Sequence, residues 1–153
     1  MSAEARLKQL GLALPNVPSP VANYVPFRVA GNLLFLSGQG PRDEAGGMLT
    51  GKVGAEVSVE EAYRRARLIG LQLLSATRQA LGSLDRVEAV LKVLGMVNAV
   101  PDFKDHPKVI NGFSDLMVEV FGEAGRGARS ALGTNALPGG IAVEIEAFFQ
   151  VRQ

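Results

Sequence analysis

Two segments of this chain predict strands that are apolar on both faces, and this pattern limits the folds open to it. Successive side chains of a strand point to opposite faces of the sheet. In residues 87–94 and 141–148, apolar side chains occupy both alternating sets of positions. In the first segment we expect Val90 and Leu94 to point opposite to Val93. A sheet built from such strands needs cover on both faces, because large exposed apolar patches are rare on monomers.

The two long helices of the chain are marked by start and stop signals. Ser58 and Glu61 form a capping-box pattern before a run of apolar residues at helical spacing, and Gly82 predicts the end of that helix. Asp105 is expected to cap a second helix, which ends at Gly122.

The remaining elements predict a single α+β domain over residues 1–153, with a helix and a proline-rich arm in residues 1–22. A hairpin is expected over 27–36, a long strand over 86–100, and two final strands near 128–130 and 143–147. Both helices follow strands, so right-handed crossovers place them on one face of a mixed β-sheet. We expect a second copy of the chain to cover the other face in a closed cyclic oligomer. The alternative is a cover formed by residues 1–20.

Composition excludes several classes of site. The net charge is +1, so the chain lacks the basic field expected of a nucleic-acid-binding protein. No cysteine is present, and the single histidine, His106, is expected at the surface, so we predict no metal site. No segment approaches the length of a membrane span and no signal peptide is visible, so we expect a cytoplasmic protein without a membrane partner.

One basic and one acidic side chain near the C-terminal end suggest chemistry. We predict that Arg129 faces Glu144 from an adjacent strand, an arrangement suited to a small anionic substrate beside an acid that activates water. The bare sequence leaves open an alternative in which Arg129 forms a structural ion pair with Glu144 or Glu146.

With these elements placed, residues 23–151 resemble the reactive intermediate deaminase (Rid or YjgF) family. The motifs that carry the resemblance are Asn-Leu-Leu-Phe-Leu-Ser-Gly-Gln (32–39), the helix from Ser58, the Asn111 helix, Ala-Arg-Ser (128–130), Leu-Pro-Gly-Gly (137–140) and Val-Glu-Ile-Glu-Ala (143–147). The resemblance implies a chorismate-mutase-like homotrimer with a barrel-like core and ligand clefts between subunits. It also implies hydrolysis of 2-imino and 2-enamino carboxylates, as in 2-iminobutanoate/2-iminopropanoate deaminases, to 2-oxo acids and ammonia. No cofactor or metal is implied.

The family motifs assign roles to six residues. Glu144 matches the glutamate that holds or activates water, and Tyr24 matches a catalytic tyrosine; Arg129 matches the arginine that binds the substrate carboxylate. Ser37, Gly38 and Asn111 match further substrate-binding positions. For Tyr24, Ser37, Gly38 and Asn111 a purely structural role is the alternative.

Two positions depart from the family pattern. Val25 replaces a serine, and Ala131 stands where deaminases often carry cysteine. These departures favour an alternative function, a non-catalytic regulatory trimer that binds small carboxylates. A ribonuclease activity, described for some members of the family, is disfavoured by the neutral charge and the lone histidine.

Overall fold

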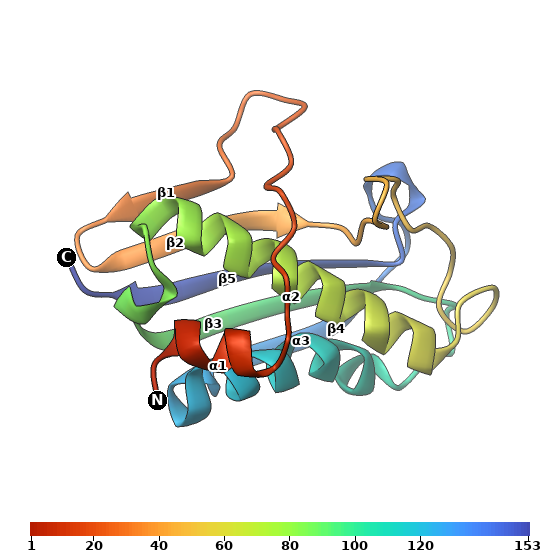
Figure 1. The fold of residues 1–153 in the computed structure, drawn as a ribbon. Coiled ribbons are helices and arrows are strands. Elements are labelled where there is room, and N and C mark those ends of the chain that lie inside the picture. The colour runs from red at the N-terminus through yellow and green to blue at the C-terminus, as the bar shows by residue number, and fades with distance from the viewer.

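The computed structural model describes all 153 residues and contains a five-stranded sheet with two long helices on one face (Figure 1). In chain order the elements are α1 (Ala3–Gln9), β1 (Phe27–Ala30), β2 (Leu33–Gln39), α2 (Val59–Leu81), η1 (Leu84–Arg86), β3 (Val87–Asn98), α3 (His106–Phe121), η2 (Gly122–Gly125), β4 (Ala128–Thr134), η3 (Pro138–Gly140) and β5 (Val143–Val151). The strand order is β1-β2-β5-β3-β4, in which only β3 and β4 are parallel. The predicted α+β class is therefore confirmed.

The helix boundaries follow the local sequence signals. The Ser58 Oγ accepts a hydrogen bond from the Glu61 amide at 3.1 Å, and Gly82 ends α2 in the left-handed region at φ 82°. The reciprocal half of the capping box does not form, because the Glu61 carboxylate accepts hydrogen bonds from Arg64 and Arg65 instead. Asp105 precedes α3, but its side chain forms no capping hydrogen bond and lies 3.3 Å from the Lys108 ammonium.

The helices α2 and α3 pack closely through glycines. A Cβ at Gly112 would lie 2.0 Å from the Tyr63 carbonyl oxygen, and a Cβ at Gly70 would lie 2.7 Å from Leu116. Both contacts are too short for a real side chain. At Gly112 the neighbour is a backbone carbonyl, so the two helix backbones approach each other there because the residue is glycine. The helices form one layer that buries alternate residues of β5, from Val143 to Val151.

The opposite face of the sheet is left open by this chain. Leu94, Met96 and Phe148 are half-buried there, and Phe35 and Leu132 are 37% and 41% exposed. The N-terminal residues do not cover this face. Helix α1 packs against α3, and Ser75 of α2 donates a hydrogen bond to the Pro15 carbonyl at 2.5 Å. The alternative of an N-terminal cover is therefore wrong, because the arm follows the helix layer.

A bulge in β3 gives Val90 a different orientation from the one predicted. Val90 pairs with Phe149 and Lys92 with Phe148, so Leu91 is an extra residue without a partner in β5. Val90 and Val93 consequently face the helices together and are both 3% exposed, whereas they were predicted to point to opposite faces. Leu94 does lie on the opposite face from Val93.

The connecting segments contain little regular structure. Met48 and Thr50 form isolated bridges to Arg42 and Ile141. The link from α3 to β4 begins with the short helix η2. No helix combines the length and the apolar character needed to cross a bilayer.

Substitution of Gly112 by alanine tests the role of the close contact between the helices. A methyl group cannot occupy a position 2.0 Å from the Tyr63 carbonyl, so α2 and α3 must separate. We expect Gly112→Ala to lower the free energy of unfolding by about 2–3 kcal/mol, measured by urea denaturation. Gln79→Ala, on the exposed side of α2, is the control and should change stability by less than about 0.5 kcal/mol.

Candidate functional site

The sheet order separates the two residues expected to face each other. β3 lies between β4 and β5, so Arg129 pairs with Val93 whereas Glu144 pairs with Met96. The prediction that Arg129 and Glu144 lie on adjacent strands is wrong. The two final strands are consecutive in sequence, but the hydrogen bonds of β3 hold them apart.

Arg129 and Glu144 also lie on opposite faces of the sheet. Arg129 has the same orientation in β4 as Gly133, where a Cβ would meet the His106 ring at the start of α3. Glu144 alternates with Val143 and Ile145, which are buried under the helices. Two strand spacings and a three-residue offset place their Cα atoms about 14 Å apart. Within one chain, the two side chains cannot act on one small molecule.

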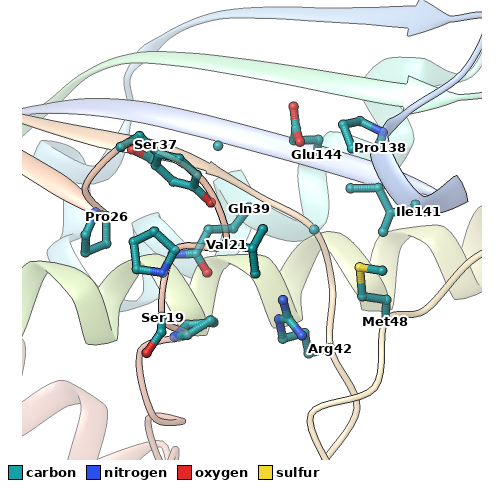
Figure 2. Close-up of a pocket in the computed structure, with 16 residues that line it drawn as sticks. Ser19, Val21, Pro26, Ser37, Gln39, Arg42, Met48, Pro138, Ile141 and Glu144 are labelled. Carbon is teal, nitrogen blue, oxygen red and sulfur yellow. The ribbon is translucent and has the colours of Figure 1, made fainter.

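Glu144 lines a pocket of about 270 Å³, called here the Glu144 pocket (Figure 2). Its walls come from the proline-rich arm, the end of β2, the loop that follows β2, and β5 with the turn before it. They comprise Pro18, Ser19, Pro20, Val21, Tyr24, Pro26, Ser37, Gly38, Gln39, Gly40, Arg42, Met48, Pro138, Gly139, Ile141 and Glu144. Four of the six predicted site residues therefore lie together here: Tyr24, Ser37, Gly38 and Glu144.

The environment of Glu144 suits a proton acceptor. Burial raises the pKa of the Glu144 carboxyl above its ordinary value, and the nearby Glu146 carboxylate raises it further. Gly38 on β2 leaves room for this side chain, because a Cβ at position 38 would lie 3.3 Å from the Glu144 carboxyl carbon. A raised pKa moves a carboxylate toward the range in which it works as a general base near neutral pH.

Ser37 connects the pocket to the arm. Its hydroxyl donates a hydrogen bond to the Val25 carbonyl at 2.6 Å, and its amide donates to the Pro26 carbonyl at 3.0 Å. These bonds hold the arm beside the end of β2. Tyr24, which precedes Val25 in the arm, is 50% exposed and lines the same pocket.

Arg129 lies in a second hollow on the helix side of β4, called here the Arg129 hollow, which Asn111 also lines. The Arg129 Nη1 donates hydrogen bonds to the Asn111 Oδ1 at 2.8 Å and to the Ser114 Oγ at 3.2 Å. No carboxylate lies within 4 Å of the guanidinium, so the ion pairs with Glu144 or Glu146 do not form. The charge of Arg129 is oriented by neutral partners and not neutralised.

The structure adds residues that the sequence pattern missed. Ser114 follows Asn111 by three residues, so the helical spacing after Asn111 was the signal that could have found it. Arg42 follows the conspicuous Gly-Gln-Gly-Pro segment that ends β2, but no pattern marked it as a pocket residue. No group of three or more His, Asp or Glu side chains is arranged to hold a metal ion.

The raised pKa of Glu144 has a testable effect on stability. The folded protein binds this proton more tightly than the unfolded chain, so ionisation of Glu144 destabilises the fold. That cost is absent below the ordinary value of 4.5 and develops as the pH rises through the raised pKa. We expect Glu144→Gln to melt at a higher temperature than the wild type at pH 7, with the difference shrinking toward pH 4. Glu44→Gln, an exposed loop carboxylate, is the control; an equal gain there would contradict the assignment.

Comparisons with known proteins agree with the fold. Residues 4–145 match the family described as "YjgF/chorismate_mutase-like, putative endoribonuclease". "Protein TCP17" of Trypanosoma cruzi is 44% identical over 148 residues, covering 96% of this chain and 92% of that protein. A crystal structure of a protein of unknown function from Agrobacterium tumefaciens superposes with a TM-score of 0.89 at 43% identity, over 98% and 94% of the two chains.

A second solved structure, of a "putative endoribonuclease" from Shewanella oneidensis, superposes with a TM-score of 0.94 at 34% identity. It covers 99% of this chain and 100% of that one. These matches extend over nearly the whole sequence, including the strands and helices that carry the candidate site residues. The chain therefore belongs to the YjgF (Rid) family that its sequence motifs indicated.

Proposed function

We propose that the protein hydrolyses small 2-imino and 2-enamino carboxylates to 2-oxo acids and ammonia, in clefts shared between subunits of a homotrimer. The observation that carries this proposal is the pair of unneutralised charges. Arg129 is oriented by Asn111 and Ser114 without an acidic partner, and Glu144 is a partly buried carboxylate with a raised pKa. The Arg129 guanidinium is suited to bind an anionic substrate, and the Glu144 carboxylate is suited to accept a proton from water.

The geometry of the single chain supports a cleft shared between subunits. Arg129 lies on β4 at one edge of the sheet, and Glu144 lies on the opposite face, so one chain supplies two separate half-sites. The open face of the sheet carries Leu94, Met96 and Phe148, which need cover from another protein surface. We propose that cyclic packing of copies through this face brings the Arg129 hollow of one copy to the Glu144 pocket of the next.

The reaction is a hydration followed by loss of ammonia. The guanidinium of Arg129 binds the substrate carboxylate through parallel N–H donors and fixes the C=N carbon. The Glu144 carboxylate takes a proton from water as the oxygen attacks that carbon, which gives a carbinolamine. The proton passes to the amino nitrogen, the C–N bond breaks, and the hydroxyl loses its proton as the 2-oxo acid forms. An imine protonated on nitrogen is already electrophilic, so the scheme requires no Lewis acid.

The direct test is hydrolysis of 2-iminobutyrate generated in place, with 2-oxobutyrate release as the readout. We expect acceleration by the wild type and a decrease in kcat/KM of about 100-fold or more in Glu144→Gln, because the general base is lost. Arg129→Ala should cost about 10- to 100-fold, the range for one charged hydrogen-bonded contact. Arg64→Ala, which removes a 55% exposed arginine of α2, is the matched control.

Two outcomes would contradict the proposal. Full activity in Arg129→Ala would remove the anion-binding role. Strong thermal stabilisation by 2-oxobutyrate without turnover would favour the regulatory carboxylate-binding trimer, the alternative raised by Val25 and Ala131. The endoribonuclease description of the family suggests a third assay, cleavage of RNA after stringent purification, for which the net charge of +1 offers little phosphate attraction.

Shared clefts predict complementation between inactive variants. A trimer should have three times the 16.2 kDa mass of the chain in light scattering, and a monomer mass would contradict it. When Arg129→Ala and Glu144→Gln are unfolded and refolded together in equal amounts, about a quarter of the clefts should receive both wild-type groups. We expect recovery of about that fraction of activity. If each chain carried a complete site, mixing would recover none.

A further inference from the structure

The arginine that lines the Glu144 pocket, Arg42, carries an inference about the substrate. Arg42 is half-buried, lies at the start of the loop after β2, and lines the pocket together with Glu144. Figure 2 shows Arg42 beside α2 and Glu144 on β5, with the Glu144 carboxylate pointing away from Arg42. The family motifs give Arg42 no role.

The backbone that carries Arg42 is fixed to the helix layer. Its amide donates to the Oε1 of Gln72 at 3.1 Å, and the Gln72 Nε2 donates to the Gln39 Oε1 and the Gly40 carbonyl, both at 2.9 Å. Gln72 is only 3% exposed, so these hydrogen bonds lie away from competing water. The backbone of Arg42 therefore has a fixed position in the pocket wall.

The guanidinium of Arg42 is not neutralised by the chain. Its Nη1 donates to the Gly46 carbonyl at 2.9 Å, and no carboxylate lies within 4 Å. The adjacent acid, Asp43, instead accepts the Gly47 amide at 2.7 Å within the loop. The Nε and Nη2 of Arg42 remain as donors, a pair whose spacing matches the two oxygens of one carboxylate.

Apolar residues lie among the other walls of the pocket. Val21, Met48 and Ile141 line it together with Arg42 and Glu144. This combination of surfaces suits a molecule that has a reacting carbon, a short aliphatic stretch and a second anionic group. The volume of about 270 Å³ limits that molecule to a small acid.

We propose that Arg42 binds a second, distal carboxylate, so that the preferred substrates are 2-imino derivatives of dicarboxylic acids. This inference rests on the proposed function for the reaction, in which Arg129 of a neighbouring copy holds the carboxylate next to the C=N group. A single guanidinium with one nitrogen already engaged favours a carboxylate over a phosphate group, which needs more donors.

Binding of two matched 2-oxo acids tests the assignment without requiring turnover. 2-Oxoglutarate and 2-oxopentanoate have five carbons each and differ in the distal carboxylate. By calorimetry we expect the wild type to bind 2-oxoglutarate at least about 10-fold more tightly, the size of a charge-assisted contact. In Arg42→Gln the two affinities should become equal to within about 2-fold, because the contact that distinguishes the acids is lost. Arg42→Lys, which keeps the charge but not the fork, should retain part of the preference.

Arg64→Gln controls for the loss of one positive charge, since it removes an exposed arginine of α2 outside the pocket. Equal affinities for the two acids in the wild type, no binding of 2-oxoglutarate, or an unchanged preference in Arg42→Gln would each overturn the role of Arg42. The same pair is then compared as imines generated in place by an amino-acid oxidase. Selective binding of 2-oxoglutarate without imine hydrolysis would overturn the proposed reaction and leave the role of Arg42 supported.

Discussion

The contact between Gly112 and the Tyr63 carbonyl joins α2 and α3 into one layer, and the rest of the molecule depends on that layer. Both helices lie on the same face of the sheet, and α1 and the start of the arm pack on the side of these helices that faces away from the sheet. The chain then has no element left to cover Leu94, Met96 and Phe148. Because apolar burial drives association as it drives folding, the uncovered face links the internal packing to the proposed trimer.

The central position of β3 also separates the two charged candidate residues. It separates Arg129, on the helix side at the sheet edge, from Glu144, on the open side. Neighbouring residues orient each of the two groups. Asn111 of α3 accepts a hydrogen bond from the Arg129 guanidinium, and Gly38 leaves space for the Glu144 carboxyl. Neither group has its counter-charge within the chain. Two preoriented, unneutralised groups of opposite sign are what the proposed shared cleft for an imine would require.

The features predicted correctly from sequence are those that depend on near neighbours along the chain. Ser58 and Gly82 specify the ends of α2 through backbone hydrogen bonds and a left-handed turn. The residues within about one helical turn of each are therefore sufficient to predict where the helix begins and ends. The partner of β5 is a different problem, because its hydrogen bonds go to β3, fifty residues earlier, and no local pattern encodes that choice.

The same distinction explains the errors in the site. The bulge at Leu91 reverses the expected orientation of Val90, and nothing in the sequence there marks an extra residue. The motif residues of the Glu144 pocket could be named from family resemblance. Arg42 could not, since its position depends on a hydrogen bond to Gln72 of α2, thirty residues away, and only the folded chain brings the two together.

The hydrogen bond from Ser37 to residue 25 explains how the arm tolerates divergence. The acceptor is the main-chain oxygen of Val25, which every amino acid supplies. Replacement of the family serine by valine therefore leaves the anchor intact while changing the surface that the arm presents. The side chain at position 25 can thus vary without releasing the arm from the end of β2, because the hydrogen bond that holds the arm goes to the main chain.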